Sequence, residues 1–152
     1  MIRPATLDDA TQVCNVLRRS ITELCYLDHG GDESYLARWL SNKTFENVRT
    51  WIQKWHFLVA EQAGTIVGAA AMSDSGQITL NYVSPDARFR GVSKALVRGL
   101  EENAKAAGLA ACNVESTITA LRFYEKVGYV RTGEGPIHPL TGAPAIILSK
   151  RL

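Results

Sequence analysis

A group of basic residues surrounds the start of an expected helix in the middle of the chain. Arg88, Arg90 and Lys94 lie close together in sequence, around Gly91 and Ser93. The apolar residues that follow recur at helical spacing. A helix N-terminus has unpaired N–H groups and a positive potential, which favour an anion and disfavour cations by a few tenths to about 1 kcal/mol each. The cluster therefore indicates either an anion site or a solvated basic surface.

Several other kinds of chemistry lack their residue patterns. Neither of the glycine-rich phosphate-binding motifs, G-x-G-x-x-G and G-x-x-x-x-G-K-[ST], is present. No G-x-S-x-G elbow is found, and Cys112 lies in an expected strand, so a serine or thiol hydrolase is poorly supported. His29, His56 and His138 are scattered without the spacing of metal ligands, so we expect no metal.

Length and composition set the class of protein. A chain of 152 residues with 46% hydrophobic and 21% charged residues suits one globular domain, which we expect to span 1–152. A formal net charge of +2 gives no reason to expect a nucleic-acid partner. The odd number of cysteines, three, favours a reducing compartment. The chain start lacks a signal-peptide pattern, and the weakly polar run 65–72 is far shorter than the roughly 20 residues that cross a bilayer, so we expect a cytoplasmic protein with no membrane partner.

Hydrophobic periodicity predicts alternating strands and helices. We expect strands at 2–5, 56–61, 65–72, 78–83, 109–114, 129–132 and 145–149. We expect helices at 7–25, around 36–40, after the capping residue Thr44 as far as Trp55, from 91 to 107, and from Ser116 or Thr117 to 127. The segments 26–32 and 133–144 are predicted to be loops, because glycine, proline and aspartate are frequent there. This order predicts an α/β (α+β) fold with a mixed sheet and helices on both faces.

Five segments carry, in the right order, motifs of one known protein family. Residues 88–93, Arg-Phe-Arg-Gly-Val-Ser, are similar to the family's Q/R-x-x-G-x-G/A signature, and 82–85, Tyr-Val-Ser-Pro, to its strand-ending Y-V-x-P. Residues 120–129 are similar to its A-x-x-F-Y-E-K-x-G-F block, 147–152 to its final strand and 2–6 to its opening. By these motifs the chain resembles the general control-related N-acetyltransferase (GNAT) superfamily. The resemblance covers essentially the whole chain and is to a bacterial, uncharacterised type of member.

The resemblance implies a fold, a cosubstrate and a set of binding residues. The fold would be a central, mostly antiparallel mixed sheet of six to seven strands, splayed between the fourth and fifth, with helices on both faces. The cosubstrate would be acetyl-CoA, with no metal. The binding residues would be Tyr82, Val83, Arg88, Phe89, Arg90, Gly91, Val92, Ser93, Lys94, Thr117, Ala120, Phe123 and Tyr124. Ser93 replaces a glycine or alanine of the family pattern and should be tolerated, whereas Thr117 replaces a frequent Asn and should weaken one hydrogen bond to the pantetheine arm.

The same resemblance implies direct transfer of an acetyl group from the CoA thioester to an amine. A backbone N–H near Val83 would polarise the thioester carbonyl. Tyr124 occupies the family position of the general acid for the CoA thiolate, although it also lies on an apolar helix stripe and could be a core residue. The strand of residues 77–83 lacks the Glu that many relatives carry. Glu115, the loop residues Asp28 and His29, or a water relay therefore remain open as the base.

The acceptor amine is left open by the sequence. Its pocket would draw on the helical N-terminal third and the segment 133–144, and the candidates to line it are Cys25, Tyr26, Asp28, His29, Trp39 and His138. A catalytically silent GNAT fold, which binds acetyl-CoA as a sensor or interaction module, is the alternative function. A homodimer would follow only by analogy with the family.

Overall fold

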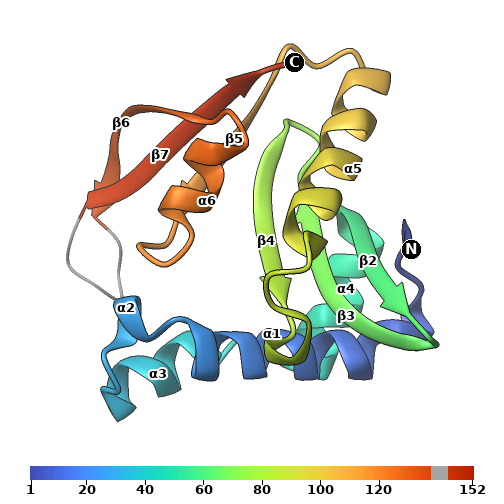
Figure 1. Ribbon diagram of the computed structural model, residues 1–152, viewed down its shortest axis with the longest axis vertical. Coiled ribbons are helices and arrows are strands. Elements are labelled where there is room, and N and C mark those ends of the chain that lie inside the picture. Colours follow the sequence, from blue (N-terminus) through green and yellow to red (C-terminus); the bar gives the residue numbers. More distant parts are fainter. Residues whose placement is uncertain (138–143) are drawn as a thin grey trace.

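The computed structural model describes residues 1–137 and 144–152. These residues form one seven-stranded sheet in the order β1-β2-β3-β4-β5-β7-β6 (Figure 1). All neighbouring strands are antiparallel except β4 and β5, which are parallel. The strands are β1 (Ile2–Pro4), β2 (His56–Gln62), β3 (Thr65–Met72), β4 (Gln77–Val83), β5 (Ala111–Ser116), β6 (Val130–Ile137) and β7 (Pro144–Arg151). The predicted mixed sheet is confirmed.

Six α-helices and two short 3-10 helices surround this sheet within the described residues. The α-helices are α1 (Ala10–Leu24), α2 (Tyr26–His29), α3 (Glu33–Leu40), α4 (Phe45–Lys54), α5 (Val92–Ala106) and α6 (Leu121–Lys126), and the 3-10 helices are η1 (Leu7–Asp9) and η2 (Pro85–Ala87). Thr44 caps α4 as predicted, because its side chain accepts a hydrogen bond from the Asn47 N–H. No helix in the described part of the chain has the length and apolar character needed to cross a bilayer.

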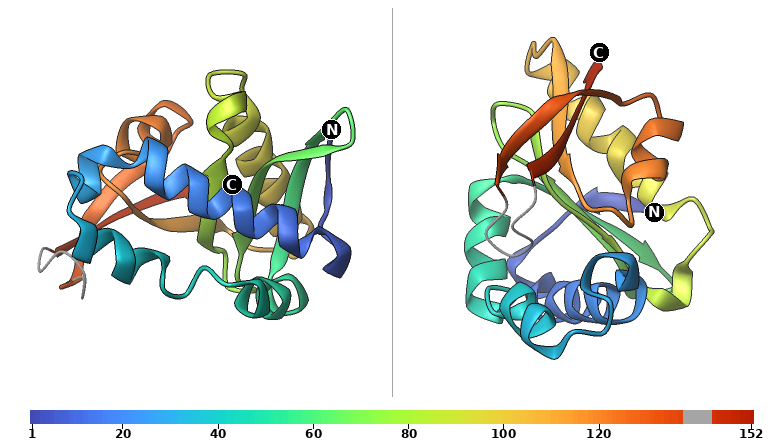
Figure 2. Two further views of the ribbon diagram at one scale, coloured as in Figure 1. Left: turned by 90° about the horizontal axis from the view of Figure 1, so that it is seen from below. Right: turned by 90° about the vertical axis from the view of Figure 1, so that its left-hand side faces the viewer.

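The helices cover both faces of the sheet, as Figure 2 shows. On one face α5 packs through Val92, Leu96 and Leu100 against strand residues such as Ala70. On the other face α1 and α4 bury a second apolar cluster against the strands. The approach of α5 is close, since a Cβ added to Gly68 would lie 2.7 Å from Val92 Cγ1. The small residues of β3 thus fix where α5 begins.

The sheet opens between β4 and β5. Only Gln77 with Asn113 and Ile78 with Val114 are paired, and beyond them the strands diverge (Figure 1). On its other edge β4 stays paired with β3 up to Val83, so it diverges from β5 and not from β3. The predicted splay between the fourth and fifth strands is therefore confirmed.

Three predicted elements are corrected. The expected loop 26–32 begins with the short helix α2, because Gly30 can take the left-handed φ of 59° that ends it. The expected loop 133–144 is strand as far as Ile137, since β6 pairs with β7 despite its irregular register, and 138–143 lie outside the described residues. The helix expected from Ser116 or Thr117 begins only at Leu121.

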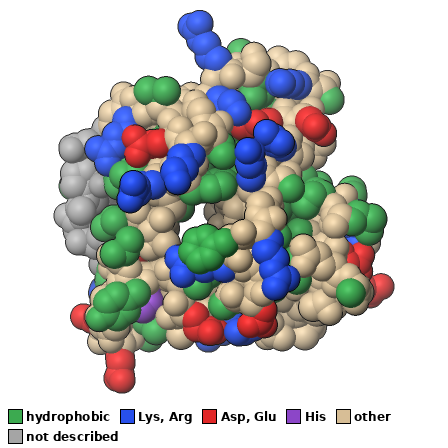
Figure 3. All heavy atoms as spheres, in the orientation of Figure 1, with side chains coloured by type: hydrophobic (Ala, Val, Ile, Leu, Met, Phe, Trp, Pro, Cys, Tyr) green, Lys and Arg blue, Asp and Glu red, His purple; other side chains and the backbone are tan. Residues whose placement is uncertain are grey.

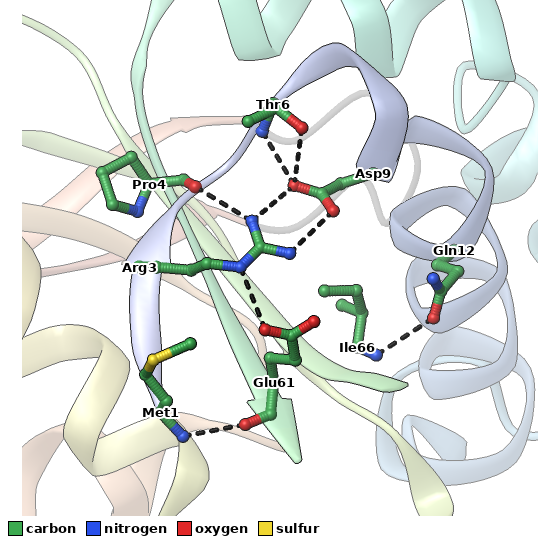
Figure 4. Close-up of polar contacts among 8 residues, drawn as sticks. All are labelled: Met1, Arg3, Pro4, Thr6, Asp9, Gln12, Glu61 and Ile66. Atoms are coloured by element: carbon green, nitrogen blue, oxygen red, sulfur yellow. Dashed lines mark hydrogen bonds and ion pairs between the residues drawn. The ribbon is translucent and has the colours of Figure 1, made fainter. Parts of the chain in front are cut away.

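An ion pair joins the first strand to the start of the first helix. Arg3 Nη1 and Nη2 donate to the two carboxylate oxygens of Asp9 at 2.8 and 2.9 Å, and Arg3 Nε donates to Glu61 on β2 at 3.2 Å (Figure 4). Asp9 also accepts from the Thr6 N–H at 2.8 Å. The Arg3 guanidinium holds the pKa of the Asp9 carboxyl below its ordinary value. This contact orients α1 against the sheet.

Replacing Asp9 with Asn should lower the free energy of unfolding by about 1–3 kcal/mol near pH 7, because a bidentate charged contact is lost. A lowered folded pKa stabilises the fold above the carboxyl's unfolded pKa of about 3.9, and this contribution is lost as pH falls through the folded value. Urea unfolding at pH 7 and at pH 3 should therefore show a smaller difference between wild type and D9N at the acid pH. The control is D8N, at the exposed neighbouring residue. An equal difference at both pH values would contradict the assignment.

Candidate active site

A cavity of about 620 Å³ lies where β4 and β5 diverge. Its walls come from β4, the end of β5, the C-terminal part of α1, the segment 87–94 and the region around α6. Figure 3 shows the molecule hollowed at this place, with Lys and Arg side chains around the opening. The lining includes most of the binding residues predicted from the sequence, namely Tyr82, Val83, Arg88, Phe89, Gly91, Val92, Ser93, Lys94, Thr117, Ala120, Phe123 and Tyr124. The predicted residue Arg90 is exposed and does not line it.

The N-terminus of α5 faces this cavity. Gly91 precedes the helix in the left-handed conformation, with a φ of 76°, and its carbonyl accepts the first intrahelical bond from the Ala95 N–H at 3.0 Å. The N–H groups of Val92, Ser93 and Lys94 therefore precede the intrahelical ladder. A Cβ added at Gly91 would meet nothing within 4 Å, so the space beside these N–H groups is open. This is the geometry of an anion site.

Phe89 stands at the rim of the cavity. Its side chain is 89% exposed and its φ is 64°, which is unusual for a residue with a side chain. The Arg88 guanidinium carbon lies 4.5 Å from the centre of the Phe89 ring. This contact holds Arg88 beside the helix start, although the aromatic ring itself stays in solvent.

The diverging part of β4 offers main-chain donors to the cavity. The Ser84 N–H donates to the Val67 carbonyl at 2.7 Å, and Val83 lies opposite Gly68. Because hydrogen-bonded and non-hydrogen-bonded pairs alternate in an antiparallel ladder, the Val83 N–H points away from β3. That direction is the gap toward β5, where pairing has stopped at Ile78. The N–H near Val83 is thus available to an acceptor in the cavity.

Tyr124 is buried, with 3% of its surface exposed, yet it lines the cavity. Its ring packs edge-on against those of Phe123 and Tyr129, at centroid distances of 5.2 and 5.5 Å. The Tyr129 hydroxyl donates to Glu101 at 2.8 Å, which fixes the second ring. Burial raises the pKa of Tyr124 to about 12, and the hydrogen bond from Asn81 partly offsets this effect. The phenol therefore keeps its proton at neutral pH and can donate it.

Two polar residues of β4 were missed by the sequence analysis. Asn81 Nδ2 donates to the Tyr124 hydroxyl at 3.2 Å. Asn81 Oδ1 and Thr79 Oγ1 are buried and have no hydrogen-bond partner among the described residues. Thr79 is the extra residue of a bulge, since Ala71 faces Leu80 while Met72 faces Ile78. The available signal was that polar residues, Gln77, Thr79 and Asn81, alternate with apolar ones along the strand.

The predicted base and the loop after β5 also lie at the cavity. Glu115 is exposed and lines the cavity wall formed by β5. Thr117 Oγ1 accepts a hydrogen bond from the Ala120 N–H at 3.1 Å, so the residue that replaces the family's Asn caps a local turn. Both residues reach the cavity from the side opposite β4.

The three predicted acceptor-binding residues are not brought to the cavity. Asp28 accepts hydrogen bonds from the N–H groups of Ile118 and Thr119, at 2.8 and 3.0 Å, and from the Thr119 hydroxyl. His29 is buried, and its Nε2 lies 3.1 Å from the Ile21 carbonyl while Nδ1 accepts from the Gly31 N–H at 3.0 Å. Tyr26 is 64% exposed and lies outside the cavity lining. Asp28 and His29 are thus engaged in joining structural elements.

The other three acceptor-pocket candidates differ in where they lie. Cys25 lines the cavity, but burial raises the pKa of its thiol to about 12, so it holds no thiolate at neutral pH. Trp39 packs with Ile21 and Cys25 in a small apolar cluster. His138 lies outside the described residues. Among the side chains that the structure describes, no three of His, Cys, Asp or Glu are grouped in a way that could hold a metal ion.

This chain is similar in sequence to a known protein family. The family model of the acetyltransferase (GNAT) domain matches residues 28–137. The chain belongs to the GNAT acetyltransferase family. The IAA acetyltransferase of Azospirillum brasilense is 34% identical to this chain over 92 residues, which cover 55% of this chain and 60% of that protein.

Solved GNAT structures share the whole fold. A GCN5-related N-acetyltransferase from Rhodopseudomonas palustris aligns over 100% of this chain and 95% of its own, with a TM-score of 0.90 and 25% identity. The PaiA N-acetyltransferase of Thermoplasma acidophilum, solved in complex with coenzyme A, aligns over 100% and 98%, with a TM-score of 0.81 and 18% identity. At 18% identity, the similarity to the PaiA structure concerns the fold alone.

Replacing Asp28 with Ala should lower the free energy of unfolding by about 1–3 kcal/mol, because two backbone N–H groups and one hydroxyl lose their acceptor. Amide hydrogen exchange at Ile118 and Thr119 should become faster than in wild type. The control is D74A, at an exposed aspartate that contacts only the His56 ring. Unchanged exchange at both amides would contradict a structural role for Asp28.

Proposed function

We propose that this protein is an acetyl-CoA-dependent N-acetyltransferase, which moves the acetyl group directly to a primary amine. The observation that carries the proposal is that three groups meet in one cavity: the open N-terminus of α5, the inward N–H near Val83 and the protonated Tyr124 hydroxyl. Family membership supports the same reaction.

The N-terminus of α5 would hold the pyrophosphate of acetyl-CoA. The N–H groups of Val92, Ser93 and Lys94 supply hydrogen bonds, and the helix dipole supplies positive potential. Arg88 and Lys94 add charge at the same wall of the cavity. Bound phosphate also removes the repulsion between these cations and the positive end of the helix. The residues present therefore fit the cosubstrate.

The chemical step would use the groups on either side of the gap. The amine nitrogen forms a C–N bond to the acetyl carbon while the Val83 N–H stabilises charge on the carbonyl oxygen. The C–S bond then breaks, and its electron pair stays on the CoA sulfur. Tyr124 gives its proton to that sulfur. The proton lost by the amine returns to the phenolate, so the products are the N-acetylated amine and the CoA thiol.

The route of that returning proton is assigned to Glu115 or to water. Glu115 is the carboxylate on the cavity wall, whereas Asp28 and His29 already use their hydrogen-bonding groups within the fold. An exposed carboxylate can pass a proton to water with little reorganisation. A free base on β4 is not required by this arrangement.

We further propose that the protein acts in the cytoplasm. Cys14, Cys25 and Cys112 are all free and buried. Unpaired cysteines are usual in a reducing compartment.

The reaction is tested by measuring free CoA thiol after mixing the protein with acetyl-CoA and a panel of primary amines. The panel should include amino acids, polyamines, aminoglycosides and peptide N-termini. Release of CoA that depends on an amine supports the enzyme, and mass spectrometry of the product would identify the acceptor. Stabilisation by acetyl-CoA without release from any amine would favour a silent binding module. Absence of both would contradict any acetyl-CoA function.

Replacing Tyr124 with Phe should lower kcat roughly 100-fold, because the proton donor for the thiolate is removed while the ring packing is kept. The dissociation constant for acetyl-CoA should stay within about twofold of wild type, since the hydroxyl is not part of the anion site. Steady-state kinetics and calorimetry measure the two quantities. The matched control is Y26F, at an exposed tyrosine outside the cavity. An unchanged kcat in Y124F would refute the role.

Replacing both Arg88 and Lys94 with Ala should weaken acetyl-CoA binding about 10-fold or more, because two cations leave the phosphate site. The loss should shrink as salt concentration rises, since exposed charges are screened. Arg98 supplies the control, because it is an exposed basic residue of the same helix and lies outside the cavity lining. Calorimetry at two salt concentrations measures the dissociation constants for acetyl-CoA. A loss of affinity in R98A equal to that in the double variant would contradict the site.

A further inference from the structure

Asn81 is the residue of β4 that reaches Tyr124. The Asn81 Nδ2 donates to the Tyr124 hydroxyl at 3.2 Å, across the gap between β4 and α6. A tyrosine hydroxyl has one hydrogen to donate and can also accept. Because Tyr124 is the acceptor in this bond, its own hydrogen is not used by Asn81. No described residue accepts that hydrogen, so it is free to be donated into the cavity.

The other end of the Asn81 amide has no partner. Its Oδ1 is buried and accepts no hydrogen bond from the described residues. A buried acceptor left unsatisfied costs about 1–3 kcal/mol, so a bound ligand with an N–H or O–H would be favoured at this position. Asn81 and Tyr124 line the same cavity. The oxygen is therefore an unsatisfied acceptor on a residue of the cavity wall, beside the proposed proton donor.

The reactants differ in what they can offer this oxygen. The acetyl thioester group has only acceptor atoms, so it cannot satisfy Oδ1. A neutral primary amine has two N–H groups beside its lone pair. One can donate to Asn81, and the other supplies the proton that leaves after the C–N bond forms. A secondary amine has a single N–H, which is lost in the reaction, so its product has no hydrogen for Asn81.

We propose that Asn81 orients both sides of the reaction, holding the Tyr124 hydroxyl through Nδ2 and an N–H of the acceptor amine through Oδ1, and thereby selects primary over secondary amines. This inference rests on the proposed acetyl transfer and adds the residue that determines its acceptor class. One end of the amide, Nδ2, contacts the proton donor Tyr124, and the other end, Oδ1, contacts the attacking amine. Asn81 is thus a positioning residue toward Tyr124 and a binding residue toward the amine.

The test uses two variants of similar size, N81L and N81D. The acceptor is the amine of the panel above that gives wild type its fastest CoA release, together with its N-methyl derivative. We expect N81L to raise KM for the primary amine and to lower the primary-to-secondary ratio of kcat/KM about 10-fold, because the acceptor oxygen is gone. We expect N81D to keep that ratio but to lower kcat about 10-fold, since Tyr124 would then donate its hydrogen to the new carboxylate.

The controls separate this inference from folding and from the function itself. N113L and N113D alter an asparagine on β5 outside the cavity lining. Both should leave kcat and the primary-to-secondary ratio of kcat/KM unchanged. Acetyl-CoA affinity should stay within about twofold in both Asn81 variants, and if N81L does not fold, N81D alone still tests the Nδ2 role. Wild-type turnover with unchanged ratio and kcat in the variants would overturn the inference only. A rise of kcat in N81D would also overturn it, whereas a wild type without turnover would defeat the proposed function instead.

Discussion

The end of pairing between β4 and β5 is the constraint on which the rest of the site depends. Two parallel strands that stay paired over their length would bury their N–H and C=O groups in one ladder. Here pairing stops after Ile78 and Val114, while β3 keeps β4 straight by holding its other edge. The chain beyond that point must therefore leave main-chain donors facing open space. That space becomes the cavity because α1, α5 and α6 close around it.

The surroundings of this gap contain several arrangements that are unfavourable without a ligand. Cations lie at the positive end of α5, a non-glycine residue, Phe89, takes a φ of 64°, and two polar atoms of β4 are buried without partners. Each costs free energy in the isolated fold. Bound phosphate would offset the repulsion between the cations and the helix, and a ligand N–H would give a buried acceptor of β4 its missing partner. Elsewhere the described structure satisfies its buried polar side chains, as the Arg3–Asp9 and Glu101 contacts show, although Ala63 in the turn after β2 also takes a positive φ, of 50°. The cations at a helix start and the buried polar atoms without partners are thus concentrated where function is proposed.

Much of the fold could be predicted from periodicity, because most helices and strands carry clear apolar patterns. The β3 strand has the predicted bounds, and Thr44 and Gly91 lie where helix starts were expected. The short helix α2 and the second part of β6, 133–137, were wrongly predicted as loops. Asp28 followed by Gly30 and Gly31, and Gly133, Gly135 and Pro136 within β6, are typical of loops, but tertiary contacts decide the structure. The basic residues at the start of α5 and the position of Tyr124 could be predicted, because both lie in motifs that are local in sequence. Asn81 could not, because its importance comes from a contact with a residue 43 positions away.

The central claim is that the open edge of β4 and the start of α5 form one binding site for acetyl-CoA. The most direct measurement is a titration of ¹⁵N-labelled protein with acetyl-CoA, followed by the amide resonances. The account predicts saturable shifts at Val83, Val92, Ser93 and Lys94, with one common dissociation constant, and none at amides of β6. Shifts confined to other surfaces, or different constants for Val83 and the helix start, would contradict it.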